Sequence, residues 1–395
     1  METNARTTMI YLLSDHIISS LGFTSEENYS AIKAGISGLK FYEKAFELVE
    51  PIMASLINDN ALNEAFLFLP SKHSISYTRF EKATILSAYN ALKKTNIDPS
   101  SQKVLFILST TKGNIELLDP RKSKSFESER VYLWRSAQVI TSFFENPNKA
   151  LVVSNACISG AAAQLYAKRI LENSDYEYVI VIGADLLSEF IISGFQSFKS
   201  LSTEICKPFD KHRCGLNLGE AAASIIYGKT DDITALPDHS ILLLSGAIAN
   251  DANHISGPSR TGAGLSIAIE KTLKDIDVNN ISFINAHGTA TLYNDDMESM
   301  AITANGLQHI PVNSLKGYTG HTLGAAGVLE SIISCKALSD NMILKSNGSE
   351  ILETVSPLSV VTTHETSHKT HFLKLLSGFG GCNAALAFKK TMNFH

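Results

Sequence analysis

The sequence has few cysteines, and they form no metal-binding or redox pair. Five cysteines occur among 395 residues, and no two of them are arranged as Cys-x-x-Cys. A disulfide framework like that of small secreted proteins is therefore excluded. We expect the chain to work in a reducing compartment, the cytoplasm.

Long apolar runs are also missing, and so is a strong charge of one sign. The longest apolar runs, such as 179–182 and 241–244, have the length of a strand, so we expect neither a membrane span nor a secretory leader. Lysine and arginine number 34 against 39 aspartate and glutamate residues, which gives a net charge of -5. This balance argues against nucleic acid as a partner.

Short apolar runs alternate with helical patterns along the whole chain, and hydrophobic residues make up 44% of it. Helices are expected after Thr24 and Thr78, each with a glutamate three residues later, and over 161–171 and 266–276. Most apolar runs are continuous, which is typical of strands covered on both faces. The alternation predicts an α/β fold of stacked layers. Strands are expected at 10–13, 104–108, 151–154, 178–182, 223–227, 241–244, 281–285 and 371–375.

Cys157 is the candidate nucleophile. It lies in Val153-Ser154-Asn155-Ala156-Cys157-Ile158-Ser159-Gly160, where an apolar run ends and a helix of small residues begins. Such a strand–turn–helix layout exposes a side chain at the end of a sheet, and the helix N-terminus favours a thiolate. The alternative is an inert buried cysteine, and the flanking residues alone leave both interpretations open. The other four cysteines are expected to be packing residues.

Two histidines, His287 and His321, lie in turns framed by glycine. His287 follows an apolar run, and His321 follows Lys316 in a turn that leads into a helix of small residues. Open α/β sheets bind ligands at the carboxyl ends of their strands. Thr289 and Thr291 offer hydroxyls to the amide groups of a linear substrate. A zinc site is the less favoured alternative, because the His-Glu-x-x-His spacing is absent.

Together these motifs resemble the β-ketoacyl-acyl-carrier-protein synthases, the condensing enzymes of the thiolase fold. The resemblance covers nearly the whole chain. It implies a five-layer αβαβα fold made of two similar halves, with the nucleophile in 1–232 and the histidines and lysine in 233–395. Further motifs of the resemblance are Pro208-Phe209-Asp210, Gly219-Glu220, Asp251-Ala252-Asn253-His254 and Gly378-Phe379-Gly380-Gly381.

The resemblance implies a Cys-His-His active site for decarboxylative condensation. Cys157 would hold an acyl chain as a thioester, while His287 and His321 stabilise the enolate formed from malonyl carrier protein. Lys316 matches the family's buried lysine, and Glu298 the acid expected beside it. No metal and no cofactor are expected, since the substrates travel on the phosphopantetheine of an acyl carrier protein. Asp295 is expected to be a supporting residue, and Phe195 and Phe379 match gating phenylalanines. The backbone N–H groups of Cys157 and Phe379 match those of an oxyanion hole. Thr289 and Thr291 match residues that contact the pantetheine, and Lys199 matches a position where the carrier protein docks.

Assembly and pathway stay open at this point. Family members are usually homodimers, and a heterodimer with a chain-length factor is the alternative. Cys214 and Asn217 depart from the usual pattern, which suggests a specialised polyketide or aryl-polyene enzyme. The rival functions are a non-catalytic chain-length-factor-like partner and a thiolase. The complete set of site residues argues against the first. The setting of Cys382 argues against the second.

Overall fold

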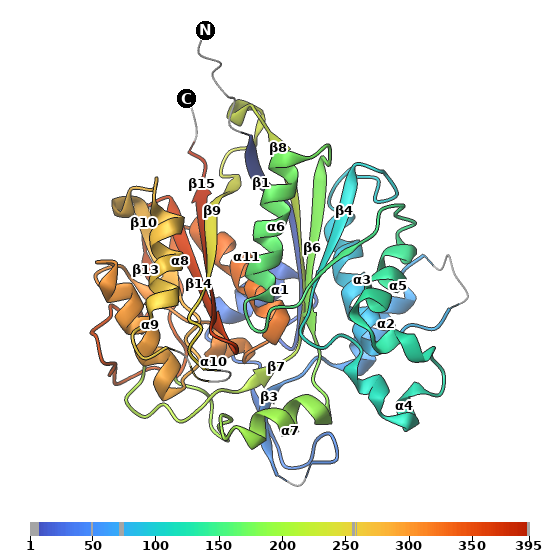
Figure 1. Ribbon diagram of the computed structural model, residues 1–395, viewed down its shortest axis with the longest axis horizontal. Helices are drawn as coiled ribbons and strands as arrows, with labels where there is room; N and C mark the ends of the chain where they lie inside the picture. The colour runs from blue at the N-terminus through green and yellow to red at the C-terminus, as the bar shows by residue number, and fades with distance from the viewer. Residues whose placement is uncertain (1–7, 49, 71–74, 255–256, 258, 393–395) are drawn as a thin grey trace.

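A sheet of ten strands crosses the molecule (Figure 1). The computed structural model describes residues 8–48, 50–70, 75–254, 257 and 259–392. The strand order is β11-β10-β14-β15-β9-β1-β8-β6-β4-β5. These strands are β1 (Met9–Ser19), β4 (Val104–Ser109), β5 (Leu151–Val153), β6 (Tyr178–Asp185), β8 (Ala221–Thr230), β9 (Ile241–Asn250), β10 (Ile281–Asn285), β11 (Val312–Asn313), β14 (His371–Gly378) and β15 (Cys382–Lys390).

The two halves of this sheet have the same topology. β1 and β9 meet at a seam through only two residue pairs, Tyr11 with Leu242 and Leu12 with Ile241. In each half the first strand along the chain lies at the seam, followed outward by the fifth, fourth, second and third. The parallel and antiparallel pairings also match strand for strand. The junction between the halves lies between β8 and β9, while a boundary directly after residue 232 stays a prediction.

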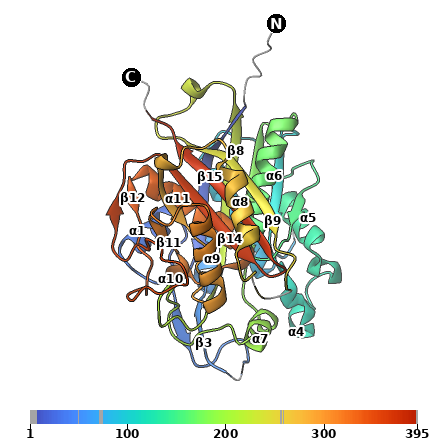
Figure 2. The same cartoon turned by 60° about the vertical axis from the view of Figure 1, so that its left-hand side comes forward.

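Helices form three layers around the two half-sheets, which gives five layers in all. α6 (Ser159–Asn173) and α11 (Ala326–Ser339) lie together in the middle and contact both half-sheets (Figure 1). α3 (Arg79–Leu92) and α5 (Leu133–Phe143) lie on the outer side of the first half (Figure 1). α8 (Ala263–Leu273) and α9 (Leu292–Ala304) lie outside the second half (Figure 2). The predicted α/β fold of the thiolase type is confirmed.

The remaining elements lie around this core. None of the helices in the described part of the chain has the length and apolar character of a membrane-crossing segment. The other helices are α1 (Ser25–Lys33), α2 (Asp59–Leu67), α4 (Pro120–Ser123), α7 (Glu189–Ser197) and α10 (Lys316–Thr319), and the short strands are β2 (Lys40–Tyr42), β3 (Ile52–Ser55), β7 (Leu218–Gly219), β12 (Met342–Ile343) and β13 (Glu365–Thr366).

Local sequence signals explain where several elements begin. Thr78 and Glu81 form the predicted capping box of α3, because each side chain accepts the other residue's backbone N–H. Thr24 caps α1 in the same way through the N–H of Glu27. All eight predicted strands are present, and most extend further than expected. The helix predicted over 266–276 instead spans α8, so its ends are shifted by three residues.

Candidate functional site

Cys157 lies in a tight turn between β5 and α6, as the sequence predicts. Ala156 has a φ of 44°, a left-handed conformation that turns the chain sharply before the cysteine. The Ser159 hydroxyl fixes the turn, since it accepts the N–H of Asn155 at 2.8 Å and donates to the carbonyl of Ala156 at 2.6 Å. The Cys157 residue is only 7% exposed. The turn therefore presents a buried thiol to the interior of a pocket.

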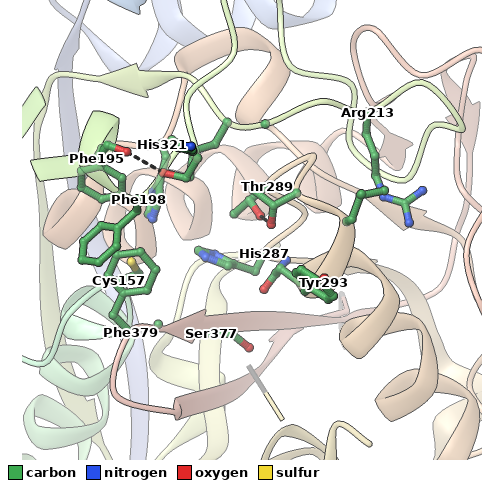
Figure 3. Close-up of a pocket in the computed structure, with 18 of the residues that line it drawn as sticks. Cys157, Phe195, Phe198, Arg213, His287, Thr289, Tyr293, His321, Ser377 and Phe379 are labelled. Atoms are coloured by element: carbon green, nitrogen blue, oxygen red, sulfur yellow. Dashed lines mark hydrogen bonds between the residues drawn. The ribbon is translucent and has the colours of Figure 1, made fainter. Parts of the chain in front are cut away.

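Three predicted site residues converge on this pocket from both halves of the chain (Figure 3). Cys157 follows β5, His287 follows β10 and His321 follows α10. One nitrogen of each imidazole and the thiol sulfur all lie within 4.8 Å of one another. The ring centroids of the two histidines are 5.0 Å apart, and the rings are nearly perpendicular. The cavity has a volume of about 380 Å³.

The two imidazoles are neutral hydrogen-bond donors. Burial lowers the pKa of His287 and His321 well below the usual value, and the charge of Lys316 lowers both further. The N–H of Leu323 donates to Nδ1 of His321 at 3.3 Å. The proton of a neutral His321 must therefore lie on Nε2. This buried Nε2 has no hydrogen-bond partner among the described residues, so its N–H is free for a ligand oxygen.

The Cys157 thiol is protonated at neutral pH. Burial raises the pKa of Cys157 to about 12, and the nearby Cys382 adds to the effect. Lys316 and the backbone N–H of Phe379 act in the opposite direction. The expectation that the N-terminus of α6 favours a thiolate stays a prediction, while burial of this thiol acts in the opposite direction. Any nucleophilic attack by Cys157 must therefore include the transfer of its proton.

The acid paired with Lys316 is Glu330, not Glu298. Lys316 and Glu330 form a buried ion pair between the start of α10 and the middle of α11. Glu298 instead accepts the backbone N–H groups of His287 at 2.7 Å and Gly288 at 2.6 Å. Burial raises its pKa to about 7. The expected contact between Glu298 and Lys316 is thus corrected, and Glu298 fixes the loop that presents His287.

Asp295 and the two threonines shape the neighbouring wall of the pocket. Asp295 is buried and accepts the N–H of Thr289 at 3.0 Å and that of Phe209 at 2.8 Å. Burial raises the pKa of Asp295 to about 6. The hydroxyls of Thr289 and Thr291 lie 2.9 Å apart, and both residues line the cavity. These hydroxyls are suitable for contacts with amide groups.

Three aromatic rings line the same cavity as the thiol. Phe195 stacks on Phe379 with centroids 5.7 Å apart, and Phe198 meets Phe379 edge-on at 5.4 Å (Figure 3). A side chain at Gly378 would place its Cβ 3.0 Å from the backbone nitrogen of Cys157. The loop before Phe379 therefore packs directly on the nucleophile turn. Phe198 is missing from the sequence prediction, and no local pattern distinguishes it from a core residue.

Lys199 lies at the pocket, while its docking role stays a prediction. It is exposed, lines the cavity and has a φ of 53°. Two other basic residues, Arg121 and Lys122, are bound to acids, Arg121 to Asp119 and Lys122 to Glu116. Of these three lysine and arginine residues, Lys199 alone lines the cavity around Cys157.

The spacing of Cys157, His287 and His321 also has the dimensions of a metal site. A metal on Nε2 of His321 would require the proton to lie on Nδ1. That proton would face the N–H of Leu323, so the two donors would repel each other. The arrangement therefore favours a hydrogen-bond donor over a metal ligand, and the absence of a metal stays a prediction.

Sequence reasoning missed two buried charged residues next to the site, Glu330 and Lys374. Each lies in an element whose other residues are mainly apolar, α11 and β14. A charge in a fully covered element has to be paired. A charged residue within a mainly apolar stretch is visible in the sequence at both positions.

The chain is similar to known proteins over most of its length. The family model described as "Beta-ketoacyl synthase, N-terminal domain" matches residues 22–232, and the C-terminal domain of the same family matches residues 240–349. The 3-oxoacyl-[acyl-carrier-protein] synthase 2 of Vibrio harveyi is 26% identical over 408 residues, which cover 95% of this chain and 96% of that protein. The protein of that name from Staphylococcus aureus strain COL is 30% identical over 62% of each chain.

Solved structures share the fold. A ketosynthase (ApeO) in complex with its chain length factor (ApeC) from Xenorhabdus doucetiae has a TM-score of 0.83 at 22% identity and covers 99% of this chain and 100% of that chain. The ishigamide ketosynthase/chain length factor has a TM-score of 0.85 at 23% identity, over 98% of this chain and 100% of that one. At these identities the likeness establishes the fold alone. The two family models together extend over most of the sequence, and on that basis the chain belongs to the β-ketoacyl synthase family.

Proposed function

We propose that the protein is a 3-oxoacyl-acyl-carrier-protein synthase. The observation that supports this most directly is the convergence of a buried thiol with two neutral imidazoles in one pocket. A thiol can accept an acyl chain, and paired N–H donors can hold an oxygen that becomes negative. Neither role requires a metal.

In the first step Cys157 takes the acyl chain from a carrier protein. The sulfur bonds to the thioester carbon, the bond to the phosphopantetheine sulfur breaks, and the departing thiol receives the proton. The backbone N–H groups of Cys157 and Phe379 would stabilise the oxyanion of the intermediate. The backbone N–H of Phe379 acts on the Cys157 thiol, which supports this pairing.

In the second step malonyl carrier protein loses carbon dioxide. The bond to the carboxylate breaks, and its electron pair becomes an enolate whose oxygen is held by His287 and His321. The enolate carbon attacks the Cys157 thioester, a carbon–carbon bond forms, and the Cys157 sulfur leaves and regains a proton from water. The product is a 3-oxoacyl carrier protein. Lys316 supports this half of the reaction as a buried positive charge beside both rings.

The chain needs no cofactor of its own in this scheme, because the phosphopantetheine arm belongs to the carrier protein. Thr289 and Thr291 would hold the amides of that arm, supported by their place on the cavity wall. Phe195 and Phe379 would move aside to admit the acyl chain, supported by their stacking in the same cavity as the thiol. Five free cysteines support a reducing compartment such as the cytoplasm.

Lys199 would dock the acidic carrier protein at the pocket mouth. The substitution Lys199→Glu should raise the KM for carrier-protein substrates severalfold, because it reverses an attractive charge. The rate of Cys157 alkylation by iodoacetamide should not change. Steady-state kinetics with purified carrier protein measure both, and an unchanged KM would remove Lys199 from the docking surface.

The assembly we propose is a homodimer formed at the outer edge of β5. A heterodimer with a chain-length factor is the alternative, supported by structural neighbours described as ketosynthases with such a factor. We propose a specialised pathway that makes polyketides or aryl polyenes, supported by the departures from the usual family pattern at Cys214 and Asn217. Cys157 and both histidines argue against a purely non-catalytic partner role.

Condensation with a panel of acyl chains on the cognate carrier protein tests the proposal. Mass spectrometry should find 3-oxoacyl products that are two carbons longer than the acyl chain, and Cys157→Ala should make none. Absence of condensation with every acyl chain, alone and with a chain-length factor, would overturn the proposed function. Saturated fatty acyl preference alone would contradict the specialised pathway.

A further inference from the structure

A second buried lysine lies behind the two histidines. Lys374 on β14 is 1% exposed, as are Lys316 and Glu330. Its Nζ lies 2.6 Å from Oε2 of Glu330, whose other oxygen pairs with Lys316. One buried carboxylate is therefore shared by two buried ammonium groups.

Lys374 is also bonded to the segment that presents His287. Its Nζ donates to the carbonyls of Asn285 and Ala286, each at 3.4 Å, and to that of Leu375 at 3.0 Å. Asn285 ends β10, and Ala286 directly precedes His287. The lysine thus connects the end of one strand to the ion pair of α11.

The charges of Lys374, Lys316 and Glu330 do not cancel one another. Two lysines share Glu330, and the next acid that acts on Lys374 is Glu298 on α9, whose own pKa is raised by burial. Burial lowers the pKa of Lys374 to about 8, although Glu330 opposes this shift, so the ammonium form dominates at neutral pH. Lys374 in turn contributes to the lowered pKa of both histidines.

Stability alone gives no reason for this arrangement. A buried charge has to be removed from water at a cost of several kcal/mol, and an apolar side chain of similar size often gives equal or greater stability. Phe372 and Leu376, which point to the same face of β14 as Lys374, are apolar and buried, so an apolar side chain would suit this face. The position of the ammonium beside the histidine segment points to a role in the reaction.

We propose that Lys374 is a positioning residue for decarboxylation, which holds the His287 segment to Glu330 and places a second positive charge behind the enolate site. This inference rests on the proposed function. It assigns Lys374 to the malonyl step and not to the acylation of Cys157.

The test compares two buried lysines on neighbouring strands. Lys390 on β15 is also buried, but its Nζ binds the carbonyl of Leu338 and the side chain of Asn341, away from the pocket. We expect Lys374→Met to slow carbon dioxide release from malonyl carrier protein about 10- to 100-fold, with a KM within about twofold of the wild type. Acylation of Cys157, followed by mass spectrometry, should keep its rate. Lys390→Met should leave both steps unchanged.

The pH dependence separates this role from a purely structural one. In the wild type the decarboxylation rate should fall above about pH 8 as Lys374 loses its proton. The decarboxylation rate of Lys374→Met should not decline above this pH. Lys374→Arg should have a higher decarboxylation rate than Lys374→Met and should also lack the alkaline decline. If Lys374→Met does not fold, Lys374→Arg still tests the proposal through the alkaline limb.

Two results would overturn the inference. One is an equal loss of acylation and decarboxylation in Lys374→Met, and the other is an alkaline limb that persists in both Lys374 variants. A wild-type protein that neither acylates nor decarboxylates would instead overturn the proposed function itself.

Discussion

At the scale of single residues, a backbone group determines where His321 carries its proton. The N–H of Leu323 occupies Nδ1, and Asp185 accepts the next N–H, that of Gly324, at 2.7 Å. Asp185 also accepts the N–H and hydroxyl of Thr111, each at 2.9 Å to one oxygen. The turn that sets the His321 tautomer is therefore fixed by a fully buried carboxylate.

His321→Ala should slow carbon dioxide release from malonyl carrier protein about 100- to 1,000-fold, since loss of one oxyanion donor costs about 2.7–4 kcal/mol. His321→Gln keeps an N–H near the position of Nε2 and should retain part of the rate. Single-turnover assays with radiolabelled malonyl carrier protein measure both variants. Equal rates for the two would contradict the donor role derived from the Leu323 contact.

The raised pKa of Cys157 predicts how its reactivity depends on pH. Alkylation by iodoacetamide should accelerate from about pH 6 to about pH 9 by nearly tenfold per unit without reaching a plateau, because the thiolate fraction keeps increasing below the pKa. Peptide mass spectrometry separates this site from the exposed Cys214. A plateau near neutral pH would mean that the helix N-terminus, and not burial, controls the thiol.

At the scale of elements, the two central helices touch through glycines. A Cβ added to Gly160 on α6 would lie 2.9 Å from the Cα of Gly327 on α11, and one added to Gly327 would lie 2.5 Å from the nitrogen of Ala161. Both helices begin at site loops, α6 after Cys157 and α11 after His321. This backbone contact therefore sets the distance between the two parts of the site.

Gly327→Ala should lower the free energy of unfolding by about 1–3 kcal/mol, because backbone atoms would have to move apart. Gly194→Ala on α7 is the matched control, since its Cβ would meet nothing within 4 Å. That control should be neutral or more stable by about 0.5–1 kcal/mol. Urea denaturation measures both, and equal stability of the two variants would show that the helices can separate freely.

The elements differ in how well their sequences predict them. β4, β6 and β10 are short apolar runs between turns, so their positions were predicted closely. β15 was not predicted, because Cys382–Lys390 contains three alanines and two terminal lysines, and its long pairing with β9 joins it to a distant part of the chain.

The candidate site also has some residues that the sequence predicts well and others that it does not. Glycine-framed motifs located Cys157, His287 and His321, because each motif lies within one loop. The partner of Lys316 was assigned wrongly, since Glu330 and Glu298 are both acids on helices and only the packing of α11 decides between them. Contacts that depend on which helix lies in the middle layer are not contained in local spacing.

At the scale of the whole molecule, the two edges of the sheet differ. β11 is covered, because Val312 exchanges backbone hydrogen bonds with Ser359 and Val361. In the described part of the chain no strand pairs with the outer side of β5, and Leu151 there is 39% exposed. An open edge next to the nucleophile turn is a natural place for a second chain to add.

Leu151→Lys should weaken dimerisation, because a two-fold axis near β5 would bring two added charges together. Leu13→Lys, at a residue that is also 39% exposed but lies on β1, should leave the dimer intact. Light scattering after size exclusion at low salt measures the mass of each. A dimer that persists in Leu151→Lys at micromolar concentration would place the interface elsewhere.

The matching topology of the half-sheets has a consequence for how the site is divided. Cys157 follows the third strand of the first half, and Lys316 follows the third strand of the second, so the two residues occupy equivalent loops. In the proposed reaction one loop would form the covalent bond, while its counterpart would supply an electrostatic field. Because a single polypeptide contains both copies, these loops are free to differ in chemistry, an asymmetry that a ring of identical units could not have.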